Sequence, residues 1–162
     1  MMRLIATVGY VGYLRPAPGT WGSLAALPLF WAVHALGGFW FVVNVTLFVA
    51  LTGYMATAKM LETSNDKDPS EIVIDEVLGQ WIALFPVSYG AMLMSVDVLQ
   101  LWPGWVAAFV LFRLFDIWKP GPVGWADRQG GAMGVMLDDV IAGVFAAICV
   151  IALGGLAHGF LM

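Results

Sequence analysis

Long apolar segments separated by short polar ones make up most of the chain. Four of them are residues 39–58, 77–96, 98–117 and 140–157, and only the third contains charged side chains, Arg113 and Asp116. Each is close to the roughly 20 residues that a helix needs to cross about 30 Å of hydrocarbon. A fifth apolar segment, residues 22–36, reaches only about 22 Å as a helix. The pattern therefore predicts membrane helices, the first of them short.

Gly37 and Gly38 separate the short segment from the next one and predict a tight helical hairpin. With five crossings, all seven lysines and arginines lie on the side of the N-terminus, and only Asp97 among the eleven acidic residues lies opposite. Four crossings would instead place Arg3 and Arg15 across the membrane from Arg113 and Lys119. Because basic residues favour the cytoplasmic side, we expect five crossings, with the N-terminus in the cytoplasm and the C-terminus outside.

The composition agrees with this pattern. The chain is 61% hydrophobic and 11% charged, whereas soluble domains carry about 25% charged residues. An ordinary soluble domain of this size cannot bury so much apolar surface. A soluble globular enzyme, a disordered chain and a nucleic-acid-binding module are therefore excluded, and the net charge of −4 also argues against a nucleic-acid partner. The expected fold is an all-α integral membrane protein, a small polytopic helical bundle that forms one domain over residues 1–162.

The first polar segment, residues 9–23, contains two prolines and four glycines directly before an apolar segment. Thr20 or Ser23 could cap the helix that follows, in which case the segment is a structural turn. Alternatively, the free N–H groups of the helix start, with Arg15 nearby, could bind an anion such as phosphate. The residues alone leave both interpretations open.

The second polar segment ends in Asp75 and Glu76, which lie at the membrane entry of a long apolar segment. Ionisable residues in that position are costly and are functional candidates by default. Adjacent helical residues point about 100° apart, so one carboxylate could face a metal ion while the other meets a cation or a ligand. Gly79 lies on the same face as Asp75 and would let another helix approach closely.

The third polar segment, residues 112–143, mixes acidic and basic residues. Arg113 and Asp116 share a helix face, either as a simple ion pair or as contacts to substrate and metal respectively. Further positive charge is expected from Lys119 and Arg128. A second acidic pair, Asp138 and Asp139, stands before the last apolar segment and repeats the arrangement at Asp75 and Glu76.

Two acidic pairs at one membrane face predict a single site. Four carboxylates together with Asp116, interleaved with arginine and lysine, suit a divalent cation and a phosphate, because Mg2+ prefers oxygen ligands and often bridges carboxylates to phosphates. A structural network of salt bridges is the alternative. The sequence has no P-loop and no Cys-x5-Arg motif, and its one cysteine, Cys149, lies within an apolar segment.

Four motifs of the chain resemble the phosphatidylglycerophosphatase A family. They are Pro-Gly-Thr-x-Gly-Ser at residues 18–23, Asp-Pro-x-Glu-Ile-Val-x-Asp-Glu-x-x-Gly at 68–79, Phe-Arg-x-Phe-Asp-x-x-Lys-Pro-x-Pro at 112–122 and Val-Met-x-Asp-Asp-x-x-Ala-Gly at 135–143. The similarity extends over about residues 9–145. Gly121 departs from it, standing where the family has a bulky aromatic residue between two prolines.

The resemblance implies an Mg2+-dependent enzyme that hydrolyses the terminal phosphate of phosphatidylglycerophosphate to give phosphatidylglycerol, at the cytoplasmic face of a bacterial inner membrane. On this basis the expected catalytic residues are Asp75, Glu76, Asp116, Asp138 and Asp139. The expected metal ligands are Asp75, Glu76, Asp138 and Asp139. The substrate phosphate is expected to contact Arg113, Lys119, Arg128, Thr20 and Ser23.

Two other functions are alternatives to this one. A small ion or solute transporter would use the acidic cluster as an ion site, but the outer halves of the predicted spans have no charges to line a pathway. A non-catalytic membrane scaffold would not need acidic pairs at two helix entries. The sequence indicates no protein partner, and it does not decide whether water or a carboxylate attacks the phosphate.

Overall fold

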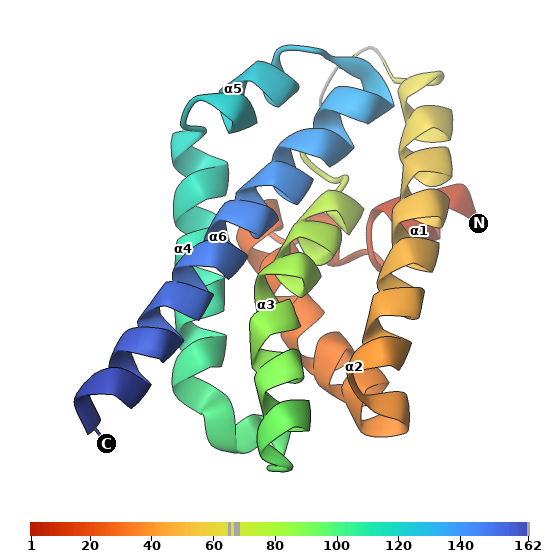
Figure 1. The fold of residues 1–162 in the computed structure, drawn as a ribbon. Coiled ribbons are helices and arrows are strands. Elements are labelled where there is room, and N and C mark those ends of the chain that lie inside the picture. The colour runs from red at the N-terminus through yellow and green to blue at the C-terminus, as the bar shows by residue number, and fades with distance from the viewer. Residues whose placement is uncertain (65, 67–68, 162) are drawn as a thin grey trace.

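The computed structural model describes residues 1–64, 66 and 69–161, and these residues form helices and no strands (Figure 1). The elements in chain order are α1 (Met2–Ala6), η1 (Val11–Tyr13), α2 (Pro18–Leu61), α3 (Ile74–Met94), η2 (Val98–Leu101), α4 (Trp102–Trp118), α5 (Pro122–Asp127) and α6 (Gly131–Leu161). The predicted all-α bundle is confirmed. Within the described part of the chain, four helical stretches are long and apolar enough to cross a membrane: Pro18–Leu61, Ile74–Met94, Val98–Trp118 and Gly131–Ala157.

The longest of these stretches, α2, is a hairpin of two helices. Gly38 interrupts it with φ 67° and ψ −162°, a backbone conformation that glycine adopts readily because it lacks a Cβ. The chain turns back there, so that residues 18–37 and 39–61 run in opposite directions (Figure 1). Residues of both halves, including Pro28 and Phe48, line one apolar groove. This is the hairpin that the glycine pair predicts.

The first half of α2 begins earlier than predicted. It starts at Pro18 instead of residue 22, because proline is well suited to the first turn of a helix. Residues 18–37 would extend about 30 Å, which is long enough to cross the hydrocarbon. The capping role predicted for Thr20 or Ser23 is wrong, because both residues lie inside the helix and no side chain caps it.

The last helix also begins earlier than predicted. α6 starts at Gly131, so Asp138 and Asp139 lie about two turns inside the helix and do not precede it as expected. Residues 131–137 are mainly small or apolar and support a helix, although they extend beyond the most apolar part of the segment. Gly130 and Gly131 both have positive φ, which matches the predicted backbone turn before this helix.

Helix α3 lies at the centre of the bundle and packs closely against α6 (Figure 1). Two glycines set this distance. A Cβ added to Gly143 would overlap the backbone of Gly79, and a Cβ added to Gly79 would lie 2.6 Å from the carbonyl oxygen of Asp139. The close approach brings the acidic residues of the two helices to the same end of the bundle. Small residues commonly permit such contacts between membrane helices.

We predict that Gly143→Ala destabilises the protein by about 1–3 kcal/mol, because the new methyl group overlaps backbone that cannot move aside easily. Gly155→Ala is the matched control in the same helix, since nothing lies within 4 Å of a Cβ added there. The control should be neutral or stabilising by up to about 1 kcal/mol, as for glycine to alanine in an open helical position. Thermal unfolding in detergent measures both variants, and equal melting temperatures would contradict the close contact.

Candidate active site

A cavity of about 620 Å³ opens between the start of α2, the first turn of α3, the end of α4, helix α5 and the first turns of α6. Eight of the ten predicted site residues line it: Asp75, Glu76, Arg113, Asp116, Lys119, Arg128, Asp138 and Asp139. Thr20 and Ser23 are not among the lining residues. The bundle thus brings together side chains that are up to 64 positions apart in the sequence.

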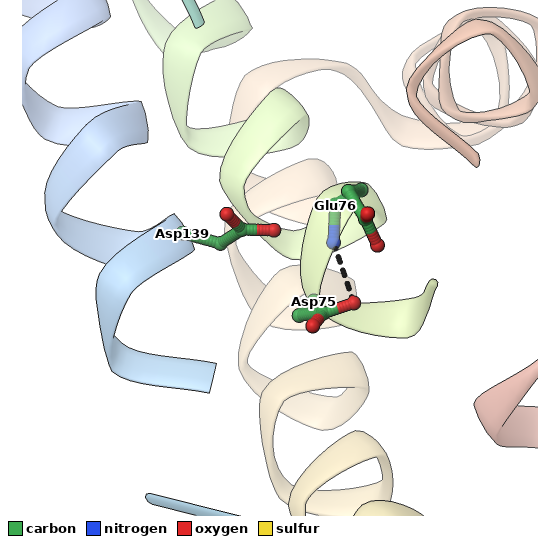
Figure 2. A group of neighbouring side chains, drawn as sticks. All are labelled: Asp75, Glu76 and Asp139. Atoms are coloured by element: carbon green, nitrogen blue, oxygen red, sulfur yellow. Dashed lines mark hydrogen bonds between the residues drawn. The ribbon is translucent and has the colours of Figure 1, made fainter. Parts of the chain in front are cut away.

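One group of carboxylates lies between α3 and α6. Asp75, Glu76 and Asp139 each offer an oxygen atom, and these atoms lie within 4.8 Å of one another. Figure 2 shows the Asp139 side chain reaching from α6 toward the first turn of α3, where the backbone N–H of Glu76 donates to Asp75 at 3.0 Å. Asp75 is 7% exposed and Asp139 3% exposed. Buried carboxylates this close repel one another unless a cation or a proton is shared between them.

A second group of carboxylates shares Asp139 with the first and adds Asp116 and Asp138. The two carboxylates that it adds already have basic partners. Arg113 Nη1 lies 2.6 Å from Asp116, which establishes the ion pair that their spacing suggested. Lys119 Nζ donates to Asp138 at 2.9 Å. The two groups therefore differ in charge compensation: ion pairs to arginine and lysine occur in the second, while the described residues show none in the first.

Lys119 joins the end of α4 to α5 and α6. It follows α4 with φ 49°, and its ammonium contacts both Asp127 of α5 and Asp138 of α6. Burial opposes its charge, but the hydrogen bonds and charges of the two carboxylates outweigh burial and raise the pKa of Lys119 above its usual range. Lys119 thus stays positively charged beside the cavity at neutral pH.

Asp127 is a lining residue that the sequence prediction missed. It contacts Lys119 across the turn between α4 and α5, and no helical spacing links the two positions in the sequence. Its neighbour Arg128 is exposed, lines the cavity and forms no ion pair among the described residues. Its place next to Arg128, a predicted phosphate-binding residue, was the one signal in the sequence that could have indicated Asp127.

The start of α2 forms another wall of the cavity. Gly19 lies so close to the Glu76 carboxylate that a Cβ on Gly19 would collide with it. Ser23, one turn further along, is buried; its hydroxyl donates to the Gly19 carbonyl at 2.9 Å and accepts from Arg113 Nη1 at 3.4 Å. Ser23 therefore contacts the candidate phosphate-binding arginine instead of lining the cavity. Arg15 donates to Ser70, which also lines the cavity.

Two further positions belong to the sequence motifs, Gly121 and Asp68. Gly121 has φ 47° and ψ −105° before α5, a conformation that residues with a Cβ rarely adopt. The departure from the family's aromatic residue thus coincides with a turn that favours glycine. Asp68, the first residue of the second motif, lies outside the described residues.

The model of the family described as Phosphatidylglycerophosphatase A matches residues 4–154, nearly the whole chain. The chain belongs to the phosphatidylglycerophosphatase A family. The resemblance predicted from the four motifs is therefore confirmed, and the chain is a phosphatase. Membership of an enzyme family thus favours the phosphatase over the transporter and the scaffold.

Three relatives are similar to this chain over most of their own length. Phosphatidylglycerophosphatase A of Escherichia coli (strain K12) is 38% identical over 148 residues, which cover 88% of this chain and 78% of the relative. Phosphatidylglycerophosphatase A of Haemophilus influenzae is 36% identical over 143 residues, covering 88% and 82%. A putative phosphatidylinositol-3-phosphatase of Bacteroides thetaiotaomicron is 37% identical over 152 residues, covering 91% and 89%. No solved structure matches the chain.

Proposed function

We propose that this protein is an Mg2+-dependent lipid phosphatase that converts phosphatidylglycerophosphate and water into phosphatidylglycerol and inorganic phosphate. The observation that carries the proposal is a cavity in which a buried group of carboxylates lies beside cationic side chains. The family and the names of two relatives support this substrate. The reaction breaks the bond between phosphorus and the glycerol oxygen, and a proton must reach that oxygen as it leaves.

We assign the metal to Asp75, Glu76 and Asp139. Their oxygen atoms are close enough to share one ion, and oxygen-only donors fit Mg2+. Of the ligands predicted from the sequence, Asp138 is the one that the structure pairs with Lys119 instead. When bound, Mg2+ would neutralise charge on the phosphate oxygens and could activate water.

The remaining charged side chains bind and orient the phosphate in this proposal. Arg113, Lys119 and Arg128 supply positive charge at the cavity, and the planar guanidinium groups suit two-point contacts with phosphate oxygens. Asp116 and Asp138 hold the first two of these cations in place. The same two carboxylates are positioned to carry a proton to or from the reacting oxygens.

We also propose that the protein crosses a bacterial inner membrane five times, with the N-terminus and the cavity on the cytoplasmic side. The two antiparallel halves of α2 each have a length that can cross the hydrocarbon, and the basic residues then share one side. The lipid can keep its acyl chains in the bilayer while its head group enters the cavity.

The five crossings predict which positions a membrane-impermeant thiol reagent reaches. In a Cys149→Ala background, Asp97→Cys should be labelled from outside the inner membrane, and Tyr13→Cys should be labelled only after the membrane is disrupted. Both substituted residues lie in segments between or before the long helices, and Tyr13 is exposed. Labelling of both cysteines from outside would contradict the five crossings.

The proposed reaction is tested directly with the purified wild-type protein in detergent. Phosphate release from phosphatidylglycerophosphate should depend on Mg2+ and stop when a chelator is added. Parallel reactions contain phosphatidylinositol 3-phosphate, the head group named for the Bacteroides relative, and glycerol 3-phosphate, which has no acyl chains. Metal-dependent release from the inositol lipid alone would reassign the substrate, and absence of release from every lipid would contradict the proposed function.

We predict that Asp75→Asn and Asp139→Asn each lower kcat by about 100-fold or more, because each removes a proposed metal ligand. Mn2+ binding, followed by electron paramagnetic resonance, should weaken in both variants, while the melting temperature stays equal or rises as carboxylate repulsion is relieved. Asp97→Asn is the control, since this residue lies between α3 and α4 and accepts a hydrogen bond that asparagine can also accept. Normal activity and normal Mn2+ binding in both site variants would refute the metal assignment.

A further inference from the structure

Gln80 is a polar residue that the proposed mechanism does not use. Its side chain is 0% exposed within α3, and neither its amide oxygen nor its amide nitrogen has a hydrogen-bond partner among the described residues. Buried amide groups are nearly always hydrogen-bonded, because an unpaired one costs free energy. That cost is greater inside a membrane, where no bulk water is available. An amide in this position therefore indicates a partner that is not a protein side chain.

Gln80 lies on α3, one turn further from the cavity than Glu76, which lines it. Because the two residues are four positions apart, their side chains share a face of the helix. Two contacts fix how α3 lies against the first half of α2: Glu76 is next to Gly19, and the indole N–H of Trp81 donates to the carbonyl of Ala26 at 2.9 Å. On α3, Gln80 lies between these two contacts.

The same two contacts place Ser23 at the level of Gln80, because on α2 it lies between Gly19 and Ala26. Ser23 accepts a hydrogen bond from Arg113. The register of the helices therefore puts Gln80 at the level of the residue that contacts Arg113, the arginine that we assign to phosphate binding.

Two more buried side-chain atoms have no partner among the described residues, Oε2 of Glu76 and Nε of Arg113. These two side chains lie together, because a Cβ built on Gly19 would be within 3.2 Å of both. With the Gln80 amide, they form a mixed set of two acceptor oxygens and two donor nitrogens. A metal ion would need acceptors only, and an anion would need donors only, whereas water both donates and accepts. Buried waters commonly satisfy about three such groups each. A carboxylate offers about four acceptor positions, so Glu76 can bind water and a metal ion together.

We propose that Gln80 is a positioning residue, which acts through one or two buried waters on Arg113 and Glu76. Its amide oxygen holds the Nε–H of Arg113, and its amide N–H groups hold the Glu76 carboxylate. The guanidinium is then fixed with its Nη end toward the cavity, where it meets the phosphate. The functional effect rests on the proposed function, because it passes through the phosphate contact of Arg113.

The test compares Gln80→Met with the wild type. Methionine has a similar unbranched shape but cannot form these hydrogen bonds, so packing is retained while the water site is lost. We expect kcat/KM for the lipid phosphate to fall by about 10-fold or more, with a melting temperature equal to or above that of the wild type. The Kd for inorganic phosphate in the presence of Mg2+, measured by calorimetry, should rise by a similar factor.

Leu84→Met is the matched control. Leu84 is fully buried on the same face of α3, one turn further from the cavity, so this variant makes a similar packing change without touching a polar group. It should keep the wild-type kcat/KM and phosphate affinity. Equal losses in both variants, or wild-type kinetics and phosphate affinity in Gln80→Met, would overturn the positioning role.

A double-mutant cycle tests whether Gln80 acts through Arg113. In an Arg113→Lys background the Nε–H is absent, so Gln80→Met should change the phosphate Kd less than about twofold. A full additional effect would overturn the inference. So would failure of both Gln80→Met and Gln80→Leu to fold, because that result would assign Gln80 a structural partner. Phosphate affinity also separates the two proposals: if the wild type hydrolyses no lipid but Gln80→Met still weakens phosphate binding, the proposed function fails and the role of Gln80 stands.

Discussion

The cost of burying carboxylates in an apolar helical bundle governs this structure. Moving an ion out of water costs several kcal/mol even after the protein relaxes, and the cost falls when an opposite charge is brought to it. Asp138 is nearly buried and reaches Lys119, which the turn after α4 directs toward α6. Asp116 reaches Arg113 one turn away on its own helix. The end of α4 and the first turns of α6 are therefore held together by the Lys119–Asp138 pair, while the Arg113–Asp116 pair compensates charge within α4.

Close backbone packing is what allows the two acidic segments to share one site. Asp75 and Gly79 lie one turn apart on α3, and Asp139 and Gly143 lie one turn apart on α6. Because the two glycines let the helix backbones touch, the carboxylates one turn above them come within reach of the same small ion. A larger residue at either glycine would separate the helices and the carboxylates together. Stability and site geometry thus depend on the same contact.

The long apolar helices could be predicted from the sequence, because the thickness of the hydrocarbon sets a local requirement on the length and polarity of a segment that can cross it. The hairpin at Gly38 followed from a pair of glycines between two apolar segments. The start of α6 could not be predicted in this way, because residues 131–139 are helical although they precede the uninterrupted apolar segment. Ser23 was predicted to contact the substrate phosphate, but its contact with Arg113 comes from a neighbouring helix and could not be predicted from spacing. Gln80 was missed for a related reason, because it has no distinctive spacing to Arg113.

The balance of charge in the cavity explains why a metal belongs to the proposed reaction. Six acidic and three basic side chains line it, so on its own the cavity is a poor place for a phosphate monoester, which carries up to two negative charges. Arg113 and Lys119 are already shared with carboxylates and cannot reverse this excess. A divalent cation at Asp75, Glu76 and Asp139 would remove most of it and leave the arginine and lysine groups to act on the phosphate. In this arrangement the carboxylates that hold the metal and the cations that hold the phosphate need each other, because either set alone would leave the cavity with the wrong charge.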